Sequence, residues 1–284
     1  MKQTIKKYIP QKVWQGVRSF LISIRTLLEN LGPSIRTVNY CGYDLYYNSG
    51  NSIIRRLRDA DSFESGTCDS IEQELKKHVQ KNEQAVLLDI GANLGLISLR
   101  VARNVPQAHI YAFEPGPKQY SLLKKTLDAN NLSARIHAAN VALSDTTGTQ
   151  KFFIHPKRDM AKDGLRDTKR GESTIAIEVK TMTADAWWME AGKPRIDVVK
   201  IDTEGAELLV LRGATNLLMQ CRPAIILEIE SLNLRAYPYA PADIVRFLGD
   251  KRYTLRTLDG LLVTNENIDA VIETGVDTYI ALPS

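Results

Sequence analysis

The chain has 284 residues, a net charge of +4, and an apolar share of 44% beside 25% charged residues. This balance is typical of a globular protein with ample material for a core, and the mild charge gives no argument for nucleic-acid binding. The cysteines Cys41, Cys68 and Cys221 are far apart and odd in number. They indicate reduced thiols in a cytoplasmic protein, and their spacing fits no zinc site.

The front of the chain is basic and amphipathic. Residues 1–30 hold six Lys and Arg side chains against the single acid Glu29, with apolar residues at helical spacing between them. No apolar run approaches the length of a membrane span, and there is no signal-peptide core with a cleavage site. Such a helix most often packs on its own domain or on a second subunit. The alternative is peripheral contact with an anionic membrane surface, at the inner face of the membrane.

Residues 35–48 alternate in the manner of a hairpin around Gly42. Ser52 can cap a short helix, and Asp69 or Ser70 can cap another that runs to about residue 79. We therefore interpret residues 1–70 as an N-terminal extension, made of a basic helix, a hairpin and a short helix. Residues 71–284 form the main domain in this interpretation.

The main domain opens with a strand, a glycine turn and a helix. Ala85–Ile90 is an unbroken apolar run apart from Asp89, which is typical of a strand buried on both faces of a parallel sheet. Gly91 and Gly95 frame a tight turn, and residues 96–102 have helical spacing. This succession is the first unit of a nucleotide-binding α/β sheet.

The turn itself restricts the ligand. A dinucleotide fingerprint needs a middle glycine where this chain has Asn93, and a phosphate loop needs a lysine that is missing here. The carboxylate of Asp89, just before the turn, favours a cationic or hydroxyl-bearing ligand over a pyrophosphate. S-adenosylmethionine fits, because it carries a sulfonium, an ammonium and a ribose diol. The alternative is a purely structural turn of an α/β protein.

The alternation of strands and helices continues along the chain. A second strand over 108–113 ends at Glu114, 25 residues beyond Asp89, about where a sheet domain places its ribose-binding acid. The further expected elements are a helix from Pro117, a strand over 136–141, a turn after residue 142, hairpin strands 151–154 and 174–179, a strand over 196–202, one helix to about 220, a strand over 224–229 and a helix from 241. Strands over 253–258 and 277–282 follow, with no helical pattern between them. We predict a mostly parallel sheet flanked by helices, with an antiparallel strand pair at its C-terminal end.

Four segments in this order resemble the FkbM family of methyltransferases. They are Asp89–Gly95, Phe113–Pro115, Ala142–Asp145 and Val199–Glu207, within a resemblance that covers roughly residues 35–260. The family acts mainly on hydroxyls of sugars, glycans and polyketide-type products. Two departures are Thr203, where the family usually has valine, and Glu230, where a histidine is frequent.

The resemblance implies the class I methyltransferase fold and its cofactor contacts. Gly91, Asn93 and Gly95 would line the methionine end of S-adenosylmethionine, and Glu114 would accept both ribose hydroxyls. Ser144 and Asp145 would lie near the adenine.

The acids Asp202, Glu204 and Glu207 are the candidate catalytic residues. They follow the strand over 196–202, and open α/β sheets bind ligands at the carboxyl ends of their strands. An alcohol sheds its proton as it attacks a methyl group, and a carboxylate within reach can accept it. We assign this role to Asp202. Glu204 and Glu207 either hold substrate hydroxyls or cap the next helix. We interpret Lys200 as a member of a structural ion pair. The scattered histidines support no metal site.

The sequence thus predicts an O-methyltransferase acting on a saccharide or a saccharide-bearing molecule. N- or C-methylation of a small metabolite on the same fold is the nearest alternative. A nicotinamide-dependent dehydrogenase would need the missing third glycine. A non-enzymatic binding module is the remaining alternative, and the acids at 89, 114 and 202 argue against it.

Overall fold

The computed structural model describes residues 35–49, 51, 53–54, 57, 64–155, 162–169 and 174–284. The predicted basic helix over 1–30 lies outside these residues, and so does most of the short helix predicted after the hairpin. Within the described part of the chain, no helix combines the length and the apolar character that a membrane crossing requires.

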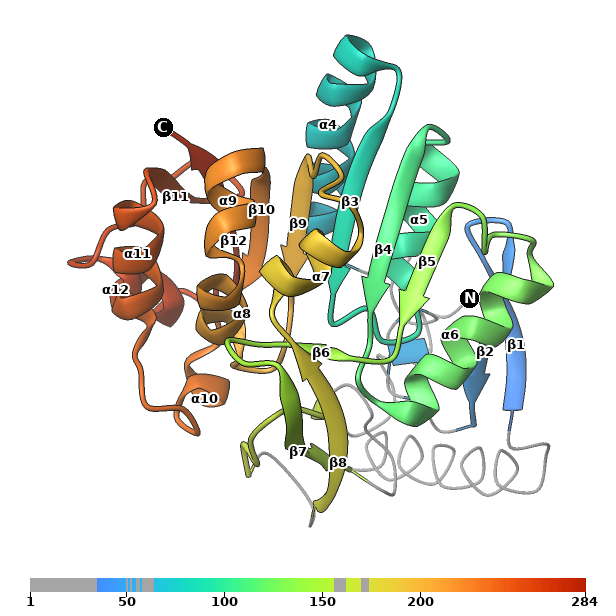
Figure 1. Ribbon diagram of the computed structural model, residues 1–284. Helices are drawn as coiled ribbons and strands as arrows, with labels where there is room; N and C mark the ends of the chain where they lie inside the picture. Colours follow the sequence, from blue (N-terminus) through green and yellow to red (C-terminus); the bar gives the residue numbers. More distant parts are fainter. Residues whose placement is uncertain are drawn as a thin grey trace, which may run out of the picture.

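The centre of the fold is a seven-stranded sheet in the order β11-β12-β10-β9-β3-β4-β5 (Figure 1). Five strands are parallel: β3 (Ala85–Ile90), β4 (Ala108–Phe113), β5 (Ile136–Ala139), β9 (Val198–Ile201) and β10 (Ala224–Glu228). Strand β12 (Thr278–Pro283) runs antiparallel between β10 and β11 (Tyr253–Thr257). This topology confirms the predicted mostly parallel sheet with an antiparallel pair at its C-terminal end.

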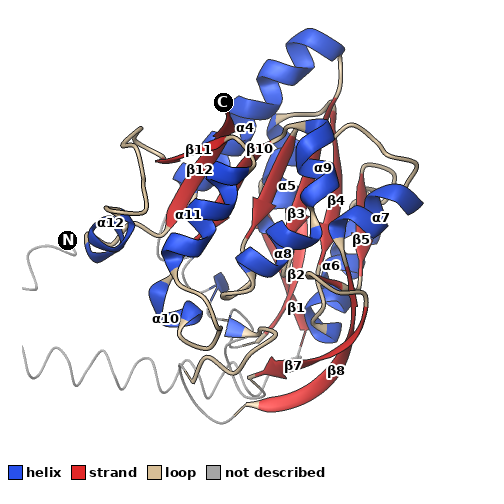
Figure 2. Ribbon diagram, turned by 60° about the vertical axis from the view of Figure 1, so that its left-hand side comes forward, coloured by secondary structure: helices blue, strands red, loops and turns tan. Residues whose placement is uncertain are grey.

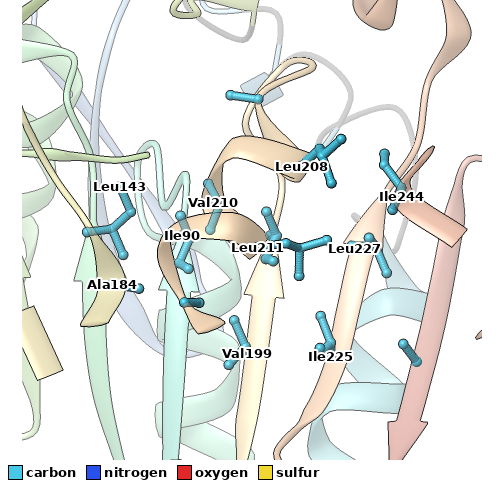
Figure 3. Packing of buried hydrophobic residues seen from close by; sticks show 14 of the residues in the cluster. Ile90, Leu143, Ala184, Val199, Leu208, Val210, Leu211, Ile225, Leu227 and Ile244 are labelled. Atoms are coloured by element: carbon cyan, nitrogen blue, oxygen red, sulfur yellow. The ribbon is translucent and has the colours of Figure 1, made fainter. Parts of the chain in front are cut away.

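The parallel strands are mostly apolar because helices cover both faces of the sheet, and Asp89 of β3 and Lys200 of β9 are exceptions. Successive side chains point to opposite faces, so Leu87 enters one core and Leu88 the other. One face is covered by α4 (Ser65–Asn82), α5 (Leu96–Asn104) and α6 (Pro117–Ala129), and the other by α7 (Ala184–Glu190), α8 (Glu207–Gly213), α9 (Thr215–Cys221) and α11 (Pro241–Asp250). Figure 3 shows Leu211 of α8 above Val199 and Ile225 on the second face. Each fully buried leucine or isoleucine contributes about 1.5–3 kcal/mol of transfer free energy.

The predicted hairpin is confirmed as β1 (Ile35–Tyr40) and β2 (Tyr43–Asn48), with Gly42 in its turn. It is fixed to α6 by polar contacts: the Tyr46 amide donates to Thr126 Oγ1 at 3.0 Å, and the Asp44 amide donates to Asn130 Oδ1 at 3.0 Å. Residue 70, the proposed domain boundary, lies inside α4. The hairpin therefore packs directly on the helices of the main domain.

A second, three-stranded sheet is inserted between β5 and α7. It contains β6 (Ala142–Leu143), β7 (Gly148–Ile154) and β8 (Ile175–Met182), with β7 and β8 antiparallel as the predicted hairpin requires. Residues 142–143, expected to open a turn, instead form a short strand parallel to β8. In Figure 2, β7 and β8 curve below the carboxyl ends of the large sheet. The insertion is therefore positioned to cover the edge at which α/β sheets bind ligands.

Two expectations about helices differ from the structure. The single helix expected up to residue 220 is divided at Ala214 into α8 and α9. The last residue of α8, Gly213, packs against the Ser144 carbonyl at a separation that leaves no room for a side chain. A short helix, α12 (Ile268–Glu273), also lies between β11 and β12. Only Ile268 and Val271 of α12 are buried, so its sequence carries almost no periodic signal. The remaining helix, α10, spans Ser231–Leu234.

Candidate active site

A cavity of about 480 Å³ opens at the carboxyl ends of the sheet strands. This volume lies in the range of small-molecule and cofactor sites, roughly 300–1,000 Å³. The wall includes the residues that directly follow β3, β4 and β9 and the last residue of β10, together with side chains from the inserted sheet and loop. Of the ten candidate residues from the sequence, five line it: Gly91, Asn93, Glu114, Asp202 and Glu204.

The turn after β3 is fixed by close backbone contacts. Gly91 has a φ of +80°, and a Cβ there would lie 1.8 Å from the carbonyl oxygen of Asp202. Asn93 also adopts a left-handed conformation, with a φ of +51°. Amides of Gly91 and Ala92 both donate to the Phe113 carbonyl at 3.0 Å. The turn is thus held between β4 and β9, and only glycine fits at its first position.

Glu114 is buried beside this turn. One carboxylate oxygen accepts the Asn93 amide at 2.8 Å, and the other accepts the Gly116 amide at 2.7 Å. Burial raises the pKa of Glu114 to about 7, although the two amides act in the opposite direction. An ionised carboxylate offers about four acceptor positions. A ribose bound in the cavity would donate its hydroxyls to the remaining positions, which is the role that the sequence analysis expects of Glu114.

Lys200 connects the ends of β3 and β9 underneath the cavity. Its Nζ lies 3.5 Å from Asp89 Oδ1 and 3.3 Å from Asp202 Oδ2, and it donates to the Gly91 carbonyl at 3.1 Å. The register pairs Asp89 directly with Lys200 on the neighbouring strand. Burial alone would lower the pKa of Lys200, but the carboxylates of Asp202 and Asp89 outweigh it and raise that pKa above its usual value.

Asp89 and Asp202 differ in exposure. Asp89 is fully buried behind the wall and accepts the Ser98 hydroxyl at 2.6 Å. The Asp202 side chain is 29% exposed and faces the cavity. Asp202 is therefore the member of the ion-pair network that a ligand can reach, whereas Asp89 contacts Lys200 from below.

The loop after β9 is organised by Glu207. One of its carboxylate oxygens accepts the amides of Thr203 and Gly205 at 3.1 Å and the Thr203 hydroxyl at 3.0 Å. Glu207 is buried and does not line the cavity, and burial raises its pKa to about 7. The valine usual at position 203 in the family could not donate this hydroxyl bond. Glu204, in the same loop, does line the cavity.

Three further candidates lie off the cavity wall. Gly95 precedes α5, where a Cβ would lie 2.5 Å from Leu123 Cδ1. Ser144 is buried, with its amide bonded to the Met182 carbonyl at 2.9 Å, and Asp145 is exposed to solvent. Residues 141–143, which immediately precede Ser144, line the cavity instead. Their apolar side chains form a surface suited to a flat aromatic base.

The structure adds site residues that sequence analysis missed. Phe152 reaches the cavity from β7, and Asp163 and Leu165 reach it from the loop between β7 and β8. Asp163 accepts Gln119 Nε2 at 2.6 Å and the His155 amide at 2.8 Å. Glu228, the last residue of β10, also lines the cavity. The available signal for Glu228 was the one used for Asp202, an acid at the carboxyl end of a buried strand.

The cavity fits the cofactor that the sequence predicts. Three features of the site match the three parts of S-adenosylmethionine. The close approach of Gly91 to the chain suits the methionine chain. The Glu114 carboxylate, which already accepts two backbone amides, suits the ribose, and the apolar residues 141–143 suit the adenine. Carboxyl groups outnumber amino groups among the described lining residues, which suits a sulfonium cation. No three His, Cys, Asp or Glu side chains converge as metal ligands in the described ranges.

Comparison with known proteins gives the family. Residues 89–255 match the model of the methyltransferase FkbM domain. Methyltransferase sdnD of Sordaria araneosa is 34% identical over 155 residues, which are 45% of this chain and 59% of that protein. The 2-O-methyltransferase NoeI of Sinorhizobium fredii is 30% identical, over 48% of this chain and 60% of that protein. The hexuronic acid methyltransferase AglP of Haloferax volcanii is 27% identical, over 61% and 65%.

The chain therefore spans about three fifths of the length of these relatives. The family match covers more than half of the chain and contains the strand ends and turns that build the cavity, from Asp89 to the loop of Glu207 and beyond to β11. The protein belongs to the FkbM family of methyltransferases, enzymes that use S-adenosylmethionine as their cofactor.

Proposed function

We propose that the protein transfers a methyl group to a hydroxyl of a saccharide or of a saccharide-bearing molecule. The observation that carries this proposal is the Asp202 carboxylate, which faces the same cavity as the Gly91 turn and Glu114. Its contact with Lys200 at 3.3 Å fixes its position, while its 29% exposure leaves it accessible. A hydroxyl donating to Asp202 would be held beside the site of the methyl group.

The chemistry that this proposal needs is mainly positioning. S-adenosylmethionine supplies an electrophilic methyl group when bound, and the protein has to align a hydroxyl with it. Asp202 would orient the hydroxyl and accept its proton as the new bond forms. Glu204, from the loop that Glu207 holds, would bind a neighbouring hydroxyl of the same sugar. The printed names of NoeI and AglP, an O-methyltransferase and a hexuronic acid methyltransferase, support this substrate class.

The test is incubation of the full chain with methyl-tritiated S-adenosylmethionine and a panel of acceptors. The panel contains neutral glycans, uronic acid and amino-sugar glycans, simple alcohols and small amines. We expect label in a saccharide, with methylation analysis placing it on oxygen. Label found only in amines or in carbon would overturn the proposal and favour the N- or C-methylation alternative. Asp202→Asn serves as the matched control, because it should strongly reduce transfer to every hydroxyl acceptor.

A further inference from the structure

The end of β10 brings a second carboxyl group beside Asp202. Strands β9 and β10 are parallel and pair Ile201 with Leu227, so Asp202 and Glu228 are the next residues on neighbouring strands. Both line the cavity, and each carries a carboxyl group at the end of its strand. Two adjacent carboxylates repel each other when both are ionised, so their proximity favours the uptake of one proton by the pair.

The surroundings also favour one shared proton. The contacts of Lys200 are divided between Asp202 and the fully buried Asp89. Lys200, Glu204 and Glu207 are the charged groups that act on the pair, and Glu64, Glu230 and Asp277 line the same cavity. Burial, and then the charge of Asp202, raise the pKa of Glu228 well above its usual value. Because each carboxyl group feels the charge of the other, the proton affinity of the two depends on the pair.

We propose that Asp202 and Glu228 form a carboxyl pair that accepts the proton of the acceptor hydroxyl, with Glu228 as a positioning residue that acts through Asp202. This inference rests on the proposed function. In the step, the hydroxyl O–H bond breaks as the O–CH₃ bond forms. The S–CH₃ bond breaks and its electron pair stays on sulfur. The proton passes to the doubly ionised pair, where the two carboxylates share it.

The pair removes a chemical difficulty of a single carboxylate. An aspartate with a pKa near its ordinary value of about 4 is a weak base for an alcohol. A general base works best when its pKa lies near the operating pH. A second carboxylate beside it raises the affinity of the doubly ionised pair for one proton. Glu228 thus makes Asp202 a stronger base at neutral pH without any change in its position.

The first experiment is an infrared pH titration of the full chain without acceptor. We expect the band of protonated carboxyl groups to persist well above the usual range for glutamate. Glu228→Gln and Asp202→Asn should each remove the same part of that band, and the exposed Glu266→Gln should remove none. The bands from Glu114 and Glu207 remain in all variants as an internal reference. If this part of the band is lost in Glu228→Gln but not in Asp202→Asn, Glu228 holds its proton alone and the proposed pair is refuted.

The second experiment is the pH profile of kcat with an acceptor from the tritium panel. Glu228→Gln keeps a hydrogen-bond donor for Asp202 but removes the second charge. We expect the acid limb of the profile to move to lower pH and the plateau to fall by about tenfold, because a weaker base remains. An unchanged acid limb would overturn the role of Glu228. The infrared result needs no acceptor, so a titrating pair without any labelled glycan would refute the proposed substrate and leave the pair standing.

Discussion

The two halves of the cavity are built in different ways. The half at β3 and β4 is mainly backbone: the Gly91 turn and the amides of Asn93 and Gly116, which both bind the Glu114 carboxylate. The half at β9 and β10 presents the side chains of Asp202, Glu204 and Glu228. A cofactor of constant shape can be bound by a backbone turn, whereas an acceptor of variable shape requires side chains that substitution can change.

The two halves meet at Lys200 and Gly91. The Lys200 ammonium donates to the Gly91 carbonyl at 3.1 Å and contacts Asp202 at 3.3 Å, while the Asp202 carbonyl occupies the space where a Cβ of residue 91 would lie. A displacement of the turn would therefore also displace the proposed base.

The largest expected effect belongs to the half at β9 and β10, where we propose that the acceptor binds. Asp202→Asn keeps the side-chain shape but removes its ability to accept a proton at neutral pH. We expect turnover to fall by about 10²–10⁴, the range for a general base. Cofactor affinity, measured by calorimetry with S-adenosylhomocysteine, should stay nearly unchanged. If affinity for S-adenosylhomocysteine falls while kcat stays normal, Asp202 binds the cofactor and is not the base.

Gly91→Ala tests the contact between the halves. The new Cβ would meet the Asp202 carbonyl, so we expect the free energy of unfolding to fall by about 4 kcal/mol. Gly42 is the matched control, because its φ of +84° is similar but no atom lies within 4 Å of its Cβ position. Gly42→Ala should cost only the left-handed strain, about 1–2 kcal/mol. Equal losses in denaturant unfolding of the two variants would show that the contact contributes nothing.

The half of the cavity at β3 and β4 could be predicted from the sequence because the motifs that mark it are local. The Asp89–Gly95 turn and Glu114 each follow a buried strand, and the apolar runs of β3 and β4 mark those strands clearly. Backbone geometry then fixes Asn93 next to Glu114. The same reasoning identified Asp202 at the end of β9. The mostly parallel sheet with its antiparallel pair at the C-terminal end followed from the alternation of elements and the terminal strand pair.

The rest depends on contacts between distant segments. Glu228 meets Asp202 only through the β9–β10 register, and Asp163 reaches the cavity from a loop whose path no periodic pattern predicts. Ser144 and Asp145 were assigned by resemblance to the adenine end. The β6–β8 pairing instead turns Ser144 into the interior and leaves Asp145 in solvent. The inserted sheet therefore changes what the residues between its first two strands can reach, and the proposed role of Ser144 and Asp145 stays a prediction.

Glu114→Ala should weaken the half of the cavity at β3 and β4 alone. It removes two charge-assisted hydrogen bonds to the ribose, each worth about 1.5–3 kcal/mol, so we expect the dissociation constant to rise by about 10²-fold or more. Thermal unfolding should show a chain that is still folded. Glu190→Ala, on the exposed end of α7, is the control for loss of a carboxylate elsewhere. An unchanged dissociation constant would refute the ribose assignment of Glu114.

The smallest expected effect is a pH dependence. As the pH falls, the stability of the free protein should rise while its affinity for the cofactor should fall. Burial raises the pKa of Glu114 from 4.5 to about 7, so the free chain gains stability as pH falls through about 7 and has the full contribution below 4.5. The ribose hydroxyls need the ionised form, so cofactor affinity should instead decrease below about pH 7, by up to tenfold per pH unit. Calorimetry and thermal unfolding between about pH 8 and pH 5 measure the two trends. Glu114→Gln should flatten the affinity trend and weaken the stability trend without removing it, because burial also raises the pKa of Glu207 to about 7 and raises the pKa values of Asp163 and Glu228. Affinity that rises as the pH falls would mean that a protonated Glu114 binds the cofactor, and its role as an acceptor of two hydroxyls would be wrong.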